Sequence, residues 1–126
     1  MAVWRLLFKT ILVVEDNDDD IFMMKMACQR SGIPHQFQVA KDGDSAVEYL
    51  SGASKFKDRS VHPFPDVVFL DIKMPKRDGH EVLKWIRDQP TMENLPVVML
   101  TGSLLATDVN RAFELALMPF GNSHGF

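Results

Sequence analysis

Cysteine is almost absent from this chain of 126 residues, which has only Cys28. A lone cysteine allows no intrachain disulfide and no thiol-based metal site, and its helical spacing favours a small buried apolar residue. Positive charge is not in excess either, because a net charge of −3 offers no general reason to expect nucleic acid or membrane binding. No run of about 20 apolar residues is present, so we expect no membrane span. No export signal is recognisable, so a cytoplasmic protein is expected.

The length and composition indicate one globular domain. Apolar residues make up 46% and charged residues 25% of the chain, which is ordinary for such a domain. The opening residues, 1–9, contain an apolar stretch that is too short for a signal peptide and lacks a small-residue cleavage site. We interpret residues 1–9 as an N-terminal extension and residues 10–126 as the domain.

Apolar runs alternate with helical periodicities, which predicts strands and helices in turn. Strands are expected at residues 10–15, 66–71 and 96–101, and a short one near an edge around residues 37–39. Helices are expected after Asn17 or Asp18, after the turn at 42–43, around 82–86 and around 109–116. Three strands are apolar nearly throughout, which indicates a parallel sheet covered by helices on both faces. Residues 51–65 are predicted to form a polar loop with solvated basic residues at Lys55, Lys57 and Arg59.

Acidic residues follow two of the apolar runs, at the point where each run ends. Residues 11–14 are followed by Glu15 and Asp16, and residues 67–70 by Asp71. In an open α/β sheet the carboxyl ends of the strands meet at one edge, and ligands bind there where the strand order reverses. The sequence therefore predicts that these three carboxylates share one site with Thr101, which ends another strand.

Three carboxylates in one pocket repel one another, so either one of them takes up a proton or a cation neutralises them. Oxygen ligands with no His or Cys nearby select a hard cation, and a few carboxylates plus water suit Mg²⁺. A bound Mg²⁺ draws a phosphoryl group to the same place, and an aspartate carboxylate is a nucleophile for phosphoryl transfer. Asp71 is the predicted acceptor, and the Thr101 hydroxyl is predicted to bond a phosphoryl oxygen as a switch.

Other polar residues have plainer interpretations. Residues 18–20 are expected to cap a helix, because acidic residues are favourable at a helix N-terminus. Asp16, Asp18 and Asp20 also match the start of a calcium-binding loop, but Ile21 and Ala27 stand where that loop requires Gly and Glu, so a calcium site is not expected. Asp78-Gly79 is most simply a turn, and no G-x-G-x-x-G follows the first strand, so a dinucleotide site is not expected. The histidines are expected at the surface and the methionines of the first helix in the core; these are His35, His62, His80 and His124, and Met23, Met24 and Met26.

Three motifs in this order resemble those of the response-regulator receiver family. They are ILVVEDN at 11–17, VFLDIKMP at 68–75 with the Asp-Gly pair at 78–79, and PVVMLTGS at 96–103. The turn at 41–43, the longer loop before the third strand and the helix at 111–115 are similar to stand-alone receivers that partner phytochrome-type histidine kinases. The resemblance covers about residues 10–115.

The resemblance implies an α/β, flavodoxin-like, doubly wound parallel sheet with strand order 2-1-3-4-5. It implies that Asp71 takes a phosphoryl group from a phosphohistidine on a sensor histidine kinase, with Thr101 as the switch hydroxyl. Mg²⁺ would be held by Glu15, Asp16, Asp71 and the backbone carbonyl of Lys73. The protein would catalyse only its own phosphorylation and dephosphorylation. Its signal would pass to an unknown downstream protein by contact or by onward phosphotransfer.

The C-terminus departs from the family pattern after about residue 116. The family has a fifth strand, a Lys-Pro pair and a fifth helix, whereas here the lysine position falls on Met118 or Ser123, depending on the alignment. We expect the fifth strand and fifth helix to be degraded or absent, which predicts weak stability, a frayed tail, or a homodimer or domain-swapped dimer. Loss of the lysine predicts weaker switching, with a smaller effect on Mg²⁺ binding.

Two other functions are consistent with parts of the sequence. The missing lysine favours a degenerate receiver that acts as a phosphorylation-independent interaction module. A metal-dependent phosphohydrolase with an aspartyl nucleophile is less favoured, because such enzymes usually have a second acid two residues after the nucleophile and Lys73 occupies that position.

Overall fold

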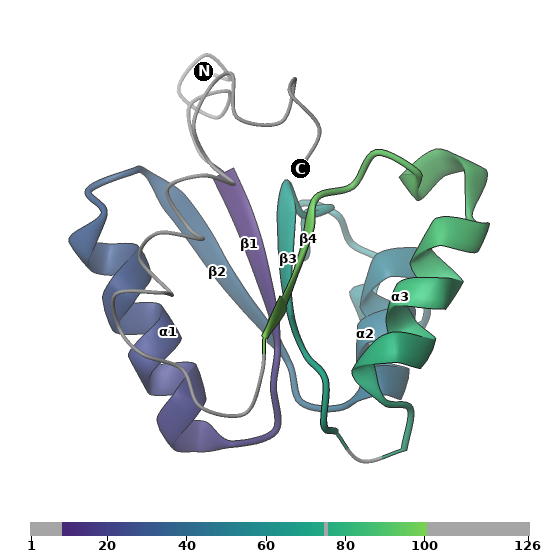
Figure 1. Ribbon diagram of the computed structural model, residues 1–126. Helices are drawn as coiled ribbons and strands as arrows, with labels where there is room; N and C mark the ends of the chain where they lie inside the picture. The colour runs from purple at the N-terminus through teal and green to yellow at the C-terminus, as the bar shows by residue number, and fades with distance from the viewer. Residues whose placement is uncertain (1–8, 75, 101–126) are drawn as a thin grey trace.

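The structure is a computed structural model that describes residues 9–74 and 76–100. Strands and helices alternate through these residues (Figure 1). The elements are β1 (Lys9–Val14), α1 (Asp18–Arg30), β2 (His35–Ala40), α2 (Gly43–Ser51), the 3₁₀ helix η2 (Ser54–Phe56), β3 (Val67–Asp71), α3 (Gly79–Asp88), the 3₁₀ helix η3 (Pro90–Met92) and β4 (Val97–Leu100). β1 begins at the last residue of the predicted N-terminal extension. The predicted helix at 109–116 lies outside the described residues.

The described strands form one parallel sheet in the order β2-β1-β3-β4. β1 pairs with β2 on one side and with β3 on the other, and β3 pairs with β4 so that Asp71 lies opposite Leu100. This order confirms the doubly wound, flavodoxin-like fold. β2 lies at an edge of the sheet, as its alternating sequence predicted. The predicted fifth strand and fifth helix fall beyond residue 100, outside the described part of the chain.

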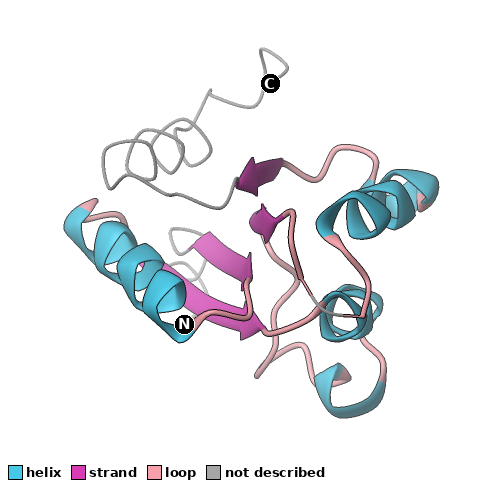
Figure 2. Ribbon diagram, turned by 60° about the horizontal axis from the view of Figure 1, so that its bottom comes forward, coloured by secondary structure: helices cyan, strands magenta, loops and turns pink. Residues whose placement is uncertain are grey.

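Side chains of the two central strands point alternately to the two faces of the sheet and enter two separate cores. On one face, α1 packs Met24, Ala27 and Cys28 against strand residues that include Phe69. Cys28 is buried as predicted, and burial raises the pKa of its thiol to about 12. Figures 1 and 2 show α1 on one side of the sheet, with α2 and α3 on the other.

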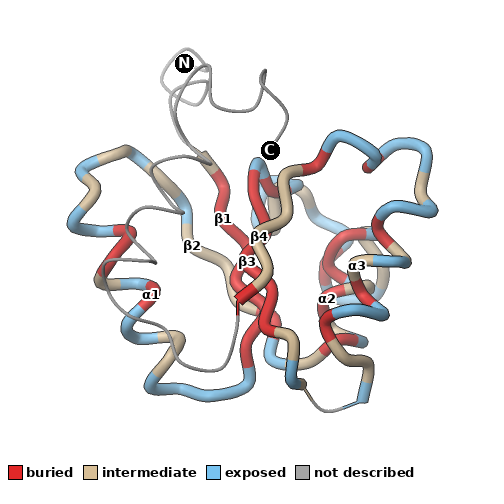
Figure 3. The backbone as a smooth tube through the Cα atoms, in the orientation of Figure 1, coloured by how far each residue is buried: buried red, intermediate tan, exposed pale blue. Residues whose placement is uncertain are grey.

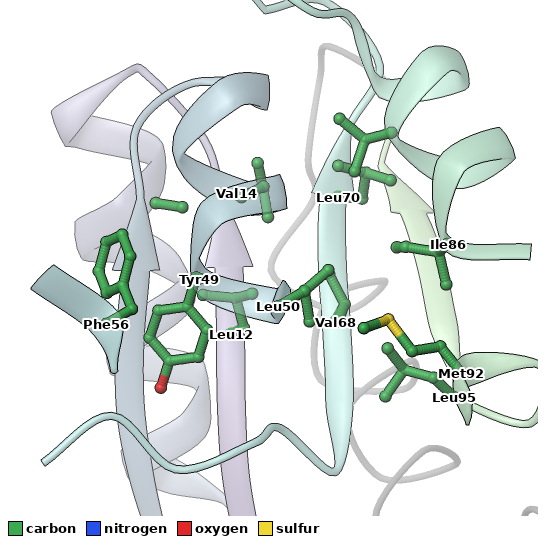
Figure 4. Close-up of a cluster of buried hydrophobic side chains, with 13 residues drawn as sticks. Leu12, Val14, Tyr49, Leu50, Phe56, Val68, Leu70, Ile86, Met92 and Leu95 are labelled. Carbon is green, nitrogen blue, oxygen red and sulfur yellow. The ribbon is translucent and has the colours of Figure 1, made fainter. Parts of the chain in front are cut away.

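The second core fills the face covered by α2 and α3. Figure 4 shows Tyr49 and Leu50 of α2 and Ile86 of α3 packed around Leu12 and Val68 of the central strands. β1 and β3 are buried along almost their whole length (Figure 3), which explains why their sequences are continuously apolar. These two strands therefore form a rigid base for the residues that follow them.

Two apolar segments are less buried than predicted. In α1 only Met24 is fully buried among the three methionines, while Met23 is 39% exposed beside Phe22, which is 62% exposed. In β4, Val97, Val98 and Met99 are half-buried, although their sequence predicts burial on both faces. None of the helices in the described ranges has the length and apolar character needed to cross a bilayer.

Side-chain caps fix where the three α-helices begin. Asn17 accepts from the Asp20 amide at 3.0 Å and Asp42 from the Ser45 amide at 2.7 Å, as N-caps do. Asp78 also caps a helix, in a reciprocal capping box with Glu81, so the Asp78-Gly79 pair is the start of α3 and not an isolated turn. Glu81, three residues after Asp78, is the sequence feature that indicates this capping box.

The 51–65 segment is more structured than the predicted polar loop. It contains η2, and its Phe56 is buried against the ring of Tyr49 at a centroid distance of 5.0 Å. His62 was predicted at the surface but is half-buried, with its ring edge-on to both of these aromatic rings. His35 is also half-buried, His80 is exposed as predicted, and His124 lies outside the described residues.

The prediction of a solvated basic loop is wrong for Arg59, which bonds the main chain of the protein. Its guanidinium donates to the carbonyls of Tyr49 and Leu50 at 2.8 and 2.9 Å, where α2 ends, and to the His62 carbonyl at 3.1 Å. A cation at a helix C-terminus also interacts favourably with the helix dipole. Lys55 and Lys57 are exposed, as predicted. The sequence does not show the difference, because all three are basic residues in one short segment.

Arg59→Ala is expected to lower the free energy of unfolding by about 2 kcal/mol, since it leaves partly buried carbonyls without their charged donor. Arg59→Lys should recover only part of the loss, because an ammonium does not reproduce the fork of the guanidinium. Urea denaturation measures both, with Lys57→Ala as the exposed control. Equal stability of the Arg59 and Lys57 alanine variants would contradict this assignment.

Candidate metal centre

Three carboxylates converge at the carboxyl edge of the sheet. Glu15 and Asp16 follow β1, and Asp71 is the last residue of β3, so the pairing of these two strands brings them together at the lower edge in Figure 1. A carboxylate oxygen from each residue lies within 4.8 Å of the others. The structure thus places together the three acidic residues that the sequence predicted to share a site.

Glu15 and Asp71 are the buried members of this carboxylate cluster. Glu15 is 3% exposed and Asp71 is 8% exposed, while Asp16 is exposed to solvent. Backbone amides orient the two buried groups: Asn17 donates to Glu15 Oε2 at 3.1 Å, and Lys73 donates to Asp71 Oδ1 at 3.2 Å. Two rigidly held carboxylates and one accessible carboxylate therefore face one small space.

Burial raises the pKa of Glu15 to about 7, and the negative charge of Asp71 adds to this effect. The hydrogen bond from the Asn17 amide acts in the opposite direction and does not offset burial. A carboxyl group with so high a pKa needs either a proton or a neighbouring cation at neutral pH. The carboxylates therefore repel one another unless a proton or a cation neutralises part of their charge.

The donor set fits a hard divalent cation. All the converging ligands are carboxylate oxygens, and the accessible Asp16 leaves space for water, as Mg²⁺ prefers. Lys73 lies two residues after Asp71 with its amide bonded to that carboxylate, so its backbone is beside the pocket, and ligation by its carbonyl stays a prediction. Thr101 lies outside the described residues, and its role also stays a prediction.

Gly79 is a site-forming residue that sequence reasoning missed. A Cβ added to Gly79 would lie 2.3 Å from the Asp71 carbonyl oxygen, and the Gly79 amide donates to the Ile72 carbonyl at 2.9 Å. Only a residue without a side chain lets the start of α3 approach the end of β3 so closely. The sequence shows a glycine at position 79 but not why it is needed. Glycine is needed there because a side chain would collide with the main chain at Asp71, and not because a turn has to be flexible.

The raised pKa of Glu15 predicts that the metal-free protein loses stability as the pH rises from about 5 to about 8. Between 4.5 and about 7 the folded state binds more protons than the unfolded state, so unfolding becomes easier with rising pH and levels off above 7. The loss is at most ~3.5 kcal/mol, since one pKa unit corresponds to ~1.4 kcal/mol. Thermal melting in EDTA across this range measures it.

Glu15→Gln should flatten that pH profile, because an amide of the same shape does not titrate. Added Mg²⁺ should raise the melting temperature of the unsubstituted protein more at pH 8 than at pH 5. A stability that is constant or rises between pH 5 and 8 in EDTA would contradict the assigned shift.

Comparison with known proteins identifies the family. The model of the response regulator receiver domain family matches residues 11–120. The chain belongs to this family. Its members act in two-component signalling, generally through phosphorylation and not as turnover enzymes, and they bind Mg²⁺ at an acidic pocket.

Individual relatives place this receiver near the phytochrome-associated response regulators. Response regulator Rcp1 of Synechocystis is 35% identical over 107 residues, which cover 85% of this chain and 71% of Rcp1. The crystal structure of the phosphorylated cyanobacterial phytochrome response regulator RcpA has a TM-score of 0.70 at 33% identity, covering 89% of this chain and 77% of RcpA. The Mn²⁺-bound form of Rcp1 has a TM-score of 0.69 at 32% identity, with 88% and 77% covered.

Proposed function

We propose that this receiver accepts a phosphoryl group on Asp71 from a phosphohistidine of a sensor histidine kinase and passes the signal on by protein contact. The convergence of Glu15, Asp16 and Asp71 within 4.8 Å carries the proposal. Its relatives support the proposal, because RcpA is a phytochrome response regulator whose crystal structure is of the phosphorylated form. A phytochrome-type kinase is therefore the partner class that we propose.

Asp71 is suited to attack phosphorus because its carboxylate is held and partly shielded from water. The Lys73 amide fixes the rotation of the carboxylate by donating to Oδ1. In the transfer, an Asp71 oxygen forms a bond to phosphorus while the bond between phosphorus and the histidine nitrogen breaks, and the imidazole leaves. The product is an acyl phosphate on Asp71, a residue that is only 8% exposed to solvent.

Glu15, Asp16, Asp71 and the Lys73 carbonyl are the proposed ligands of Mg²⁺. When bound, the ion supplies positive charge that offsets the carboxylates and the incoming phosphoryl oxygens. Glu15 has the strongest requirement for it, because its buried carboxyl group keeps a proton near pH 7 without a cation. Asp16, at the solvent side, is placed where a ligand can enter.

The remaining assignments extend this proposal beyond the described residues. Thr101 is the proposed switch hydroxyl, and it directly follows Leu100, which pairs in register with Asp71. A homodimer or domain-swapped dimer, proposed from the C-terminal sequence, also depends on residues after 100. The downstream partner is proposed only as a protein.

Incubation of the full chain with acetyl phosphate and Mg²⁺, followed by intact-mass measurement, tests the function. We expect one phosphoryl adduct that forms with Mg²⁺ and does not form in excess EDTA. No adduct under either condition would support the phosphorylation-independent interaction module instead. Steady release of inorganic phosphate without an accumulating adduct would support a phosphohydrolase.

A further inference from the structure

The loop between β3 and α3 follows Asp71 directly, and its backbone takes part in the site. The Lys73 amide in this loop bonds the Asp71 carboxylate. Lys76 has a φ of +69°, in the left-handed region that residues other than glycine rarely adopt. Such a backbone conformation persists only where the surrounding structure holds it.

The turn that begins α2 holds this part of the loop. A Cβ added to Gly43 would lie 1.9 Å from the Arg77 carbonyl oxygen, so the two backbones are in direct contact. An ion pair flanks the contact on each side: Lys76 Nζ lies 3.5 Å from Asp42 Oδ2, and Arg77 Nε donates to Asp44 Oδ1 at 3.2 Å. Three consecutive residues of the turn thus contact two consecutive residues of the loop.

We propose that residues 42–44, the α2 turn, position the loop after Asp71 for phosphoryl transfer, with Gly43 as the principal positioning residue. The inference rests on the proposed function, because it gives the turn a part in the same site. The α2 turn acts through loop residues 76 and 77. These two residues determine where the Lys73 backbone lies beside the Asp71 carboxylate. The sequence showed the turn but not its contact with a loop more than thirty residues away.

The backbone contact is expected to matter more than the ion pairs. The side chains of Lys76 and Arg77 are 64% and 38% exposed, and pairs so open to solvent contribute little. The neighbour of Gly43 is a carbonyl group of the main chain, which cannot rotate away as the end of a long side chain can. A methyl group at Gly43 therefore has to displace the loop or the start of α2.

Gly43→Ala in the full chain tests the inference with three measurements. The rate of adduct formation from acetyl phosphate and Mg²⁺ should fall by roughly tenfold or more, because the reacting carboxylate loses its alignment. The Mg²⁺ dissociation constant, from calorimetry, should rise by about tenfold, as when an orienting neighbour of a metal ligand is removed. Hydrogen exchange should show loss of protection at the Lys73 and Gly79 amides, which are bonded at the two ends of the loop.

Glu48→Gly is the matched control, because Glu48 is an exposed residue of α2 and the change weakens the helix by its low propensity. It should lower the melting temperature and leave all three measurements unchanged. Should Gly43→Ala not fold, hydrogen exchange of the unsubstituted chain replaces it: the Lys73 amide should be protected to within about tenfold of the Ala46 amide, which bonds the Asp42 carbonyl in the turn, because the two segments open together, and a far lower protection of Lys73 is the contrary result.

A folded Gly43→Ala protein with rate, Mg²⁺ affinity and amide protection all within twofold of the unsubstituted chain would overturn the inference. If Glu48→Gly also lowered the rate, the Mg²⁺ affinity and the amide protection, the inference would be overturned as well. The changes in Gly43→Ala would then result from general destabilisation. Failure of the unsubstituted chain to take up phosphate would refute the proposed function. In that case amide protection still decides whether the α2 turn holds the loop.

Discussion

Asp71→Asn is expected to abolish the phosphoryl adduct while making the metal-free protein more stable. The amide of asparagine has no nucleophilic carboxylate oxygen, so no acyl phosphate forms. The same change removes the negative charge that helps to raise the pKa of Glu15. At pH 8 in EDTA we expect the free energy of unfolding to rise by about 1 kcal/mol, because a repulsion between two nearly buried groups is gone. Intact mass and thermal melting measure the two effects.

Asp88→Asn is the control for this prediction. Asp88 is exposed and pairs with Lys84 on the surface of α3, so its replacement should leave both the adduct and the stability unchanged. An adduct of undiminished yield in Asp71→Asn would show that another residue is the acceptor. A loss of metal-free stability in Asp71→Asn would contradict the repulsion that we infer between Asp71 and Glu15.

Gly79→Ala is expected to damage both folding and phosphorylation. The added Cβ would meet the Asp71 carbonyl oxygen at 2.3 Å and the Ile72 Cα at 2.8 Å, both of them in the main chain. Either α3 moves away from the sheet, which loosens its buried Val82, or the end of β3 bends. Overpacking of this kind costs roughly 2–3 kcal/mol, and a displaced Asp71 should react at least roughly tenfold more slowly. Urea denaturation and the rate of adduct formation measure the two effects.

Gly32→Ala separates this effect from the ordinary cost of replacing glycine. Gly32 follows α1 with a φ of +71° and has open space where a Cβ would lie, so only backbone strain opposes the change. That strain is ~1 kcal/mol, and the adduct should form at the normal rate. If Gly79→Ala costs no more than Gly32→Ala and still phosphorylates normally, the close approach at Asp71 is not needed for the site.

The acidic site could be predicted because, in a parallel sheet, the residues that follow different strands lie at the same edge. Continuous apolar runs indicate strands buried on both faces, and buried parallel strands end at a common edge. Glu15, Asp16 and Asp71 come directly after such runs, so their convergence needed no knowledge of distances. What the sequence could not supply was the degree of burial, which separates the buried Glu15 from the exposed Asp16 and raises the pKa of Glu15.

Two of the failures of prediction have the same physical cause, which is contact between residues of different structural elements. Arg59 has the composition of a solvated loop residue, yet it bonds the end of α2. Gly79 has the composition of a turn residue, yet its backbone lies against the main chain of Asp71 and Ile72. Local periodicity carries no information on such partners.

The sequence by itself determined the alternation of strands and helices, the parallel sheet, and the edge at which the carboxylates lie. These follow from short-range patterns of apolar and polar residues, which decide which side chains leave water. Only the tertiary structure decided that the α2 turn contacts the loop after β3, because that contact depends on backbone shape where a glycine leaves space. The apolar strands are therefore encoded locally in this chain, whereas the contact between the α2 turn and the loop after Asp71 depends on how separate backbone segments meet.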